Sequence, residues 1–249
     1  MSLAISSLEH MLGSLGQADV HDQPYSHLYV EQFFPGGLYW ELLDNLPAPA
    51  DYYPMAKKRL SDTGGYTRMG FDLTSERVTT MSNDARDVFL EVIEGLSSPE
   101  FKRAVFGLLA TDLSTRYGVP KSQVPDIPAR CVPKLFRDTS GYRIDPHPDT
   151  RRKIVTMMIY LPRDESQRSL GTSVYRRRLS LRGLIDSQSK FEEVKRFPFL
   201  PNSGFAFVVT NRLGKRSWHG REPLPPNSGV RNSLAMTFYA PDDKACEGY

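Results

Sequence analysis

The spacing of apolar residues changes near residue 125, and this change restricts the folds open to the chain. Before it, apolar residues recur at helical intervals in four segments, at 7–16, 36–47, 82–98 and 98–118. After it, short runs of β-forming residues alternate with stretches of Pro, Gly, Asn and Ser. Helices followed by strands predict an α+β fold in which the helices cover one face of a sheet.

Two of the expected helices have recognisable ends. In 82–98, Ser82 is placed to cap the first turn, and one face carries the apolar residues Val88, Phe89, Val92, Ile93 and Leu96. The segment 98–118 is expected to form one continuous helix, which Gly118 ends.

The second half contains β-rich segments at 129–137, 142–147, 153–161, 171–178, 205–211, 215–221 and 231–240. Strands this short and this closely spaced suggest an all-β sandwich or barrel. The sequence shows no internal repeat and no low-complexity linker. It therefore predicts a single domain over 1–249, with a mainly helical part at 1–125.

Composition limits the class of protein more weakly. The 249 residues are 39% hydrophobic, enough for a sizeable core, and the net charge of +3 neither requires nor excludes a nucleic-acid partner. Cys131 and Cys246 are too few for a disulfide framework, and neither has a His or Cys close beside it for a zinc site. Without a recognisable signal peptide or an apolar run of membrane-spanning length, a cytoplasmic protein is expected.

A short motif, His147-Pro148-Asp149, raises the question of a metal site. On a strand, residues 147 and 149 would point to the same face with their stems roughly 6.5 Å apart, close enough to share one ion. Pro148 offers no ladder donor, which suits a strand end or edge. Taken alone, the motif fits a solvated turn better than a metal site.

A third candidate ligand is His219, in an expected strand, and no other histidine besides His147 follows residue 27. Two histidines and one carboxylate form the facial triad of non-haem Fe(II) oxygenases. Taken alone, His219 beside Trp218 fits a packed histidine better.

Arg231 and Ser233 favour the metal site over these simpler readings. The segment "EPLPPNSG" is expected to form a hairpin loop centred near residue 225, which would place Arg231 opposite His219, roughly 5 Å away. Strand alternation puts Arg231 and Ser233 on one face and the apolar residues on the other, namely Leu234, Met236 and Phe238. A guanidinium matches a carboxylate well, although an ordinary surface ion pair is the alternative.

In this order and spacing, the residues resemble the Fe(II)- and 2-oxoglutarate-dependent dioxygenases. That family has the pattern H-x-D, a distal His, and an Arg about ten to a dozen residues later, often as R-x-S. Its prolyl-hydroxylase-like branch is similar to "GYRIDPHPD", "VTMMIYLP", "LGTSVYRR", "SWHG" and the earlier "YSHLYVEQFFPGGLYWELLDNLP". The resemblance covers roughly residues 130–240 and implies a double-stranded β-helix core, a cupin-like jelly roll, at 126–249.

The resemblance also implies roles for individual residues. His147, Asp149 and His219 would hold Fe(II) as the catalytic centre, and Arg231 and Ser233 would hold the co-substrate 2-oxoglutarate, with O2 as the third reactant. Tyr160 lies where related enzymes often place a tyrosine on the co-substrate carboxylate. Related halogenases lack the carboxylate ligand, so Asp149 favours hydroxylation; desaturation, demethylation and ring closure stay open.

Basic residues concentrate in 151–182, which holds nine Lys/Arg and two Asp/Glu, a local excess of +7. A solvated face explains this best, and a mouth that attracts an anionic substrate is the alternative. Nucleic acid is an unlikely partner because the segment offers few aromatic residues to stack on bases, mainly Tyr160 and Tyr175.

Three functions follow from these observations. The first is an iron oxygenase that hydroxylates a small metabolite or a natural-product intermediate. The second is an oxygenase for a protein or peptide side chain, which would need an open groove rather than a closed pocket. The third is a metal-free jelly-roll binding module, against which the complete set of four polar residues argues.

Overall fold

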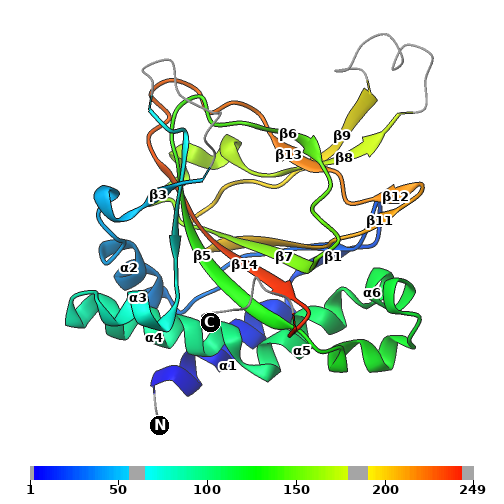
Figure 1. Ribbon diagram of the computed structural model, residues 1–249, viewed down its shortest axis with the longest axis horizontal. Helices are drawn as coiled ribbons and strands as arrows, with labels where there is room; N and C mark the ends of the chain where they lie inside the picture. The colour runs from blue at the N-terminus through cyan, green and yellow to red at the C-terminus, as the bar shows by residue number, and fades with distance from the viewer. Residues whose placement is uncertain (1–2, 56–64, 179–189, 243–249) are drawn as a thin grey trace.

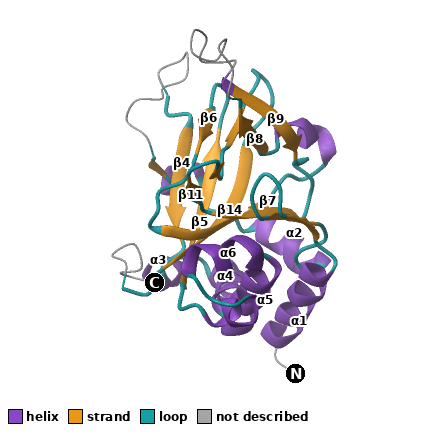
Figure 2. Ribbon diagram, turned by 90° about the vertical axis from the view of Figure 1, so that its right-hand side faces the viewer, coloured by secondary structure: helices purple, strands orange, loops and turns teal. Residues whose placement is uncertain are grey.

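The computed structural model describes residues 3–55, 65–178 and 190–242. Within them, two antiparallel sheets face each other and the helices pack against the outer face of the larger one (Figure 1). A view turned by 90° shows the strands together on one side and most helices on the other (Figure 2). This arrangement agrees with the predicted α+β class.

The larger sheet has eight strands in the order β1-β2-β10-β7-β14-β5-β4-β3. Their bounds are β1 Asp19–His21, β2 His27–Val30, β3 Tyr53–Pro54, β4 Arg68–Asp72, β5 Arg130–Asp138, β7 Lys153–Tyr160, β10 Ser203–Val208 and β14 Arg231–Tyr239. The part expected to be mainly helical, 1–125, therefore also contributes β1 to β4, which extend both edges of this sheet.

The smaller sheet has four strands in the order β6-β13-β8-β9. They are β6 Ile144–His147, β8 Ser173–Arg177, β9 Phe191–Arg196 and β13 His219–Arg221. The segment 215–221, expected as one strand, splits in two. Its first part pairs as β12 (Lys215–Arg216) with β11 (Asn211–Arg212), and Ser217 bonds back to Thr210 before the chain enters the smaller sheet.

The helices are α1 Leu3–Gly16, α2 Gly36–Asp44, α3 Ser75–Thr79, α4 Asn83–Ser97, α5 Pro99–Leu108 and α6 Ala110–Tyr117, with 3-10 turns η1 Pro49–Asp51, η2 Lys121–Asp126 and η3 Glu165–Leu170. Three expected helices appear as α1, α2 and α4. Ser82 stands at the N-cap of α4, but its side chain makes no capping hydrogen bond.

The expectation of one continuous helix over 98–118 is wrong. The backbone leaves helical geometry at Leu109 (φ −99°, ψ 19°), which separates α5 from α6. In α6 the Asp112 N–H donates to the Ser26 hydroxyl, so contact with the β1–β2 segment takes the place of a regular helical bond. Gly118 does end α6, in the left-handed conformation at φ 68°.

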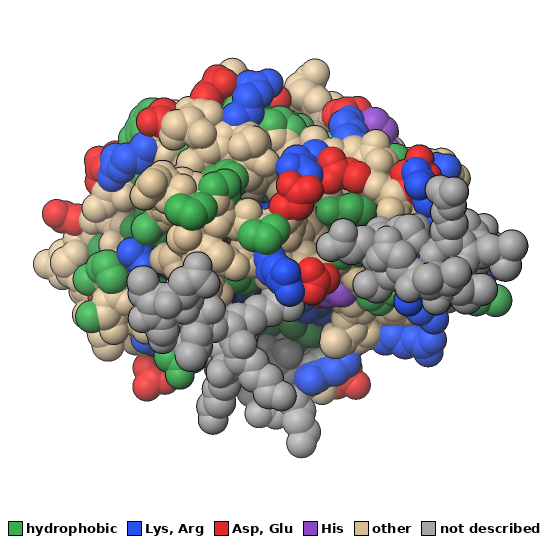
Figure 3. All heavy atoms as spheres, turned by 90° about the horizontal axis from the view of Figure 1, so that it is seen from above, with side chains coloured by type: hydrophobic (Ala, Val, Ile, Leu, Met, Phe, Trp, Pro, Cys, Tyr) green, Lys and Arg blue, Asp and Glu red, His purple; other side chains and the backbone are tan. Residues whose placement is uncertain are grey.

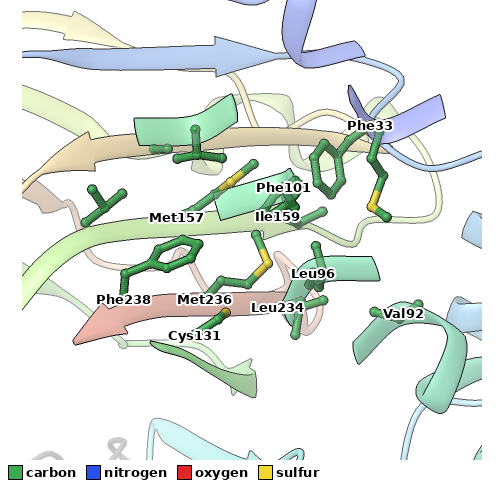
Figure 4. Close-up of a cluster of buried hydrophobic side chains, with 14 of the residues drawn as sticks. Phe33, Val92, Leu96, Phe101, Cys131, Met157, Ile159, Leu234, Met236 and Phe238 are labelled. Atoms are coloured by element: carbon green, nitrogen blue, oxygen red, sulfur yellow. The ribbon is translucent and has the colours of Figure 1, made fainter. Parts of the chain in front are cut away.

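The central strands of the larger sheet separate two environments by alternation. On β14, Leu234, Met236 and Phe238 face the helices, as the sequence predicted, and Met157 and Ile159 of β7 lie on the same face (Figure 4). The opposite face of the same strands looks toward the smaller sheet. Polar side chains are concentrated there, and the site lies on that face.

Two smaller expectations concern the cysteines and membrane spans. Cys131 is buried in the core beneath the helices, and Cys246 lies outside the described residues. None of the described helices has the length and apolar character that crossing a bilayer requires.

Candidate metal centre

Three candidate ligands converge between the two sheets. One donor atom from each of His147, Asp149 and His219 lies within 4.8 Å of the other two. The histidines are cross-strand partners on β6 and β13, with ring centroids 4.4 Å apart. Because ligand nitrogens and oxygens lie roughly 2.0–2.2 Å from a metal ion, small side-chain rotations bring all three onto one ion.

Asp149 reaches this site by a different route from the one predicted. Strand β6 ends at His147, so Asp149 lies in the following turn and not on the strand. Pro148 has no N–H with which to continue the ladder. The Asp149 carboxylate is instead held from β7, where Lys153 Nζ donates to Oδ1 (3.0 Å) and the Thr156 hydroxyl donates to Oδ2 (2.8 Å).

Both imidazoles present the same nitrogen to the shared space. The Nδ1 of His147 lies 3.0 Å from the Asp145 carbonyl oxygen, and the Nδ1 of His219 lies 2.9 Å from that of Ser217. A carbonyl only accepts, so each Nδ1 carries the proton and each Nε2 keeps its lone pair. Backbone carbonyls that fix the tautomer in this way are typical of metal-binding histidines. The donor set therefore fits a divalent metal.

The protonation states agree with this fit. Burial lowers the pKa of His219 to about 4 and also lowers the pKa of His147. For Asp149, burial acts to raise the pKa, but His219, Lys153 and the Thr156 hydroxyl together hold it below its usual value. Near neutral pH the site thus offers two neutral imidazoles and one carboxylate, the forms that bind a metal.

Gly220 sets the distance between the two histidine-bearing strands. A Cβ on Gly220 would lie 2.7 Å from the Ile144 carbonyl oxygen and 3.1 Å from the Pro146 nitrogen, both of which are backbone atoms. Strand β13 can therefore approach β6 this closely only because residue 220 has no side chain.

Gly220→Ala should weaken metal binding without removing a ligand, because it pushes β13 away from β6. We expect a loss of roughly tenfold or more in metal affinity, the range that changes outside the ligand set produce. Isothermal titration with a divalent metal measures it. Gly13→Ala in α1, where a Cβ meets nothing within 4 Å, is the matched control. Equal affinity in both variants would show that the spacing of the strands is not limiting.

A cavity of about 260 Å³ is lined by the three candidate metal ligands and by Arg231. Arg231 is only 2% exposed, and its Nη1 donates to Asp138 Oδ2 (3.1 Å) while its Nε donates to the Leu170 carbonyl (2.9 Å). Its guanidinium also lies 4.3 Å from the centre of the Phe199 ring. Burial is the main cause that lowers the pKa of Arg231 from its ordinary value.

The predicted hairpin between His219 and Arg231 is wrong. Strand β13 pairs with β6 and β8 in the smaller sheet, whereas β14 pairs with β5 and β7 in the larger sheet. The loop between them crosses from one sheet to the other, anchored by Leu224, whose N–H donates to the Tyr142 carbonyl (2.9 Å). Arg231 thus reaches the cavity from the wall opposite His219, with Asp138 as its cross-strand partner.

Ser233 and Tyr160 differ in the hydrogen bonds that their hydroxyl groups make. The Ser233 hydroxyl is buried and has no hydrogen-bond partner within the described part of the chain, on the same strand face as Arg231. The Tyr160 hydroxyl donates to the Thr172 hydroxyl (2.8 Å), and Thr172 lines the cavity. Ser233 is therefore free for a ligand, whereas the role implied for Tyr160 stays a prediction.

Sequence reasoning gave no role to Arg68 or Asp138, and it named Arg221 only as an alternative to Arg231, together with Arg143. Arg68 on β4 lies 3.1 Å from Asp138 and donates to the Tyr142 hydroxyl, and Arg221 lines the same wall as His219. Burial, with Arg231 as a smaller cause, lowers the pKa of Arg221 to about 9. Strand alternation places Arg221 on the same face as His219, two residues earlier, whereas nothing in the sequence linked Arg68 to the site.

Four of the eight described basic residues in the segment 151–182 form ion pairs with other described residues, among them Arg178 with Glu192. Lys153 contacts Asp149, Arg163 contacts Asp44 and Arg168 contacts Glu165. Arg182 lies outside the described residues. On the face seen from above, basic and acidic side chains are interspersed (Figure 3). These contacts favour the solvated face over a steering surface.

Comparison with known proteins places the fold. No family model matches the sequence, and no curated protein matches it. Among solved structures, a prolyl-4-hydroxylase from Pseudomonas putida shares 11% identity over 94% of this chain and 98% of its own (TM-score 0.51). SnoN, a non-heme alpha ketoglutarate dependent epimerase from nogalamycin biosynthesis, shares 11% identity over 94% of this chain and 82% of its own (TM-score 0.50). JOX2, solved in complex with 2OG, Fe and JA, shares 12% identity over 87% of this chain and 68% of its own (TM-score 0.54).

Such low identities establish the fold alone. The chain has the double-stranded β-helix fold that these 2-oxoglutarate oxygenases share, which confirms the fold class predicted from the sequence.

Proposed function

We propose that the protein is an Fe(II)- and 2-oxoglutarate-dependent oxygenase that hydroxylates a small molecule. The observation that carries this proposal is the set of polar groups around one cavity. Two imidazole Nε2 atoms and the Asp149 carboxylate converge on one side of it, and Arg231 also lines it. The Ser233 hydroxyl, which has no partner among the described residues, lies on the same strand face as Arg231. A metal-free binding module would have no use for this donor set.

His147, Asp149 and His219 would hold the iron, and Arg231 and Ser233 would bind the far carboxylate of 2-oxoglutarate. Iron in this site supplies the redox chemistry: one oxygen atom of O2 enters the substrate, and the other enters succinate as 2-oxoglutarate loses CO2. The chain orients the reactants. Lys153 and Thr156 fix the Asp149 carboxylate, and the Phe207 ring packs 4.3 Å from the His219 ring.

The shape of the cavity supports a small-molecule substrate over a peptide. Its volume of about 260 Å³ lies between the two sheets and is lined by both. A peptide substrate would need an extended groove. Asp149 completes a three-residue ligand set. Because related halogenases lack this carboxylate, its presence supports hydroxylation over halogenation.

Anaerobic addition of Fe(II) and 2-oxoglutarate should produce a weak visible charge-transfer absorption that neither component gives alone. The same protein, screened aerobically against metabolites, should release succinate faster with its true substrate. Absence of divalent metal binding by the wild-type protein under these conditions would contradict the proposed function.

A further inference from the structure

Three guanidinium groups surround one carboxylate at the arginine end of the cavity. Asp138, which is fully buried, lies 3.1 Å from Arg231 Nη1 and 3.1 Å from Arg68 Nε. Arg221 lies on the facing wall and forms no ion pair with any described residue. Two of the three positive charges thus share Asp138, and the third has no anionic partner.

Contacts with Tyr142 hold Arg221 in place, but one of its hydrogen-bond donors has no partner among the described residues. Only 6% of it is exposed, and its Nη2 donates to the Tyr142 carbonyl (2.7 Å) while its guanidinium lies 5.2 Å from the Tyr142 ring centre. Its Nε is buried and has no hydrogen-bond partner among the described residues. A buried cation with an unused donor is costly unless a ligand supplies the missing partner.

The charges can be counted for the proposed co-substrate complex, on which this inference rests. At the metal end, a divalent ion and Lys153 carry three positive charges against two negative charges, from Asp149 and the keto-acid carboxylate of 2-oxoglutarate. At the arginine end, Asp138 and the far carboxylate supply two negative charges against three guanidiniums. One positive charge at the arginine end stays uncompensated until a further anion enters.

We propose that Arg221 binds a carboxylate of the primary substrate, so that the protein acts on a small carboxylic acid. A guanidinium matches a carboxylate better than it matches any neutral group, because it offers planar, parallel donors. The lining of the same cavity also includes four apolar residues, Met55, Phe136, Ile144 and Met158. The acid therefore carries an apolar body beside its carboxylate.

Phenylacetate and its neutral analogue phenylacetamide serve as matched probes, with binding followed by ligand-observed NMR. In the anaerobic protein saturated with Fe(II) and 2-oxoglutarate, phenylacetate should bind roughly tenfold or more tighter than phenylacetamide. Arg221→Gln should remove that preference and leave 2-oxoglutarate affinity within about threefold. Arg163→Gln, an exposed arginine paired with Asp44 outside the cavity, should change neither.

Two results would overturn the proposal. One is phenylacetate that binds the Fe(II) protein alone but no longer binds once 2-oxoglutarate is saturating, and the other is a tenfold loss of 2-oxoglutarate affinity in Arg221→Gln; both would assign Arg221 to the co-substrate. If Arg221→Gln does not fold, Arg221→Lys keeps the charge and should keep part of the preference. A wild-type protein that binds no 2-oxoglutarate refutes the proposed function instead, and the probe pair on the metal-free protein still tests Arg221.

Discussion

His219→Ala is expected to abolish metal binding. His219 is one of the three candidate ligands, and the Ser217 carbonyl sets its tautomer so that Nε2 is the donor shared with His147 and Asp149. Removing a ligand should cost more than the 10–100-fold that changes outside a ligand set cost, so we expect a loss of more than about 100-fold in affinity. Titration with Fe(II) under anaerobic conditions, followed by the charge-transfer absorption with 2-oxoglutarate, measures the loss.

His10→Ala is the matched control for this experiment. His10 lies on α1, and its Nε2 contacts the Gln32 carbonyl at the surface, far in the fold from the smaller sheet. Its replacement should leave metal affinity unchanged. Because His219 is buried against Phe207, circular dichroism should accompany the titration to show that the variant is folded. A folded His219→Ala protein with normal affinity would place the metal elsewhere.

Arg231→Ala should weaken 2-oxoglutarate binding by roughly 30-fold or more. Truncating one partner of a desolvated charge pair costs roughly 2–5 kcal/mol, and about 1.4 kcal/mol corresponds to tenfold in affinity. Iron binding should survive, because all three ligands are untouched. Arg231 also neutralises Asp138, so its loss leaves that buried carboxylate with Arg68 alone and should lower the free energy of unfolding as well.

Two gentler variants separate binding from stability. Arg231→Lys keeps the charge but loses the planar fork, and its 2-oxoglutarate affinity should fall between wild type and Arg231→Ala. Ser233→Ala removes a buried hydroxyl that has no partner in the described chain, so stability should hardly change. The binding free energy of 2-oxoglutarate to Ser233→Ala should be weaker than that of the wild type by roughly 1.5–3 kcal/mol at most. Unchanged 2-oxoglutarate affinity in a folded Arg231→Ala protein would assign the carboxylate to another arginine.

Periodicity predicted the individual elements well, because burial on one face forces a regular pattern. Leu234, Met236 and Phe238 all face the helices for this reason, and their alternation placed Arg231 and Ser233 toward the cavity. The break at Leu109 left no such trace. It depends on a hydrogen bond from α6 to Ser26, a contact between segments far apart in the sequence.

The candidate site shows the same division. The ligand types and their order were readable, but the partnership of His219 and Arg231 was misread as a hairpin. A loop rich in Pro and Gly can turn back within one sheet or cross to another, and only the facing sheet decides which. Asp138 and Arg68 entered the site through the register of β4 on β5, which local sequence does not specify. The roles of all these residues, and the single-domain organisation, stay predictions.

The crossing of the chain between β13 and β14 has a consequence for selectivity. The candidate metal ligands come from the smaller sheet and the loop after β6, whereas Arg231 and Ser233 come from the larger sheet. In the proposed function, the distance between the two sheets would limit the length of the dicarboxylic acid that can bridge them. Aromatic side chains packed between the sheets, such as Phe205 and Tyr160, set this distance. The size of these aromatic side chains would thus help to select a five-carbon acid over a shorter or longer one, in addition to the groups that touch the acid.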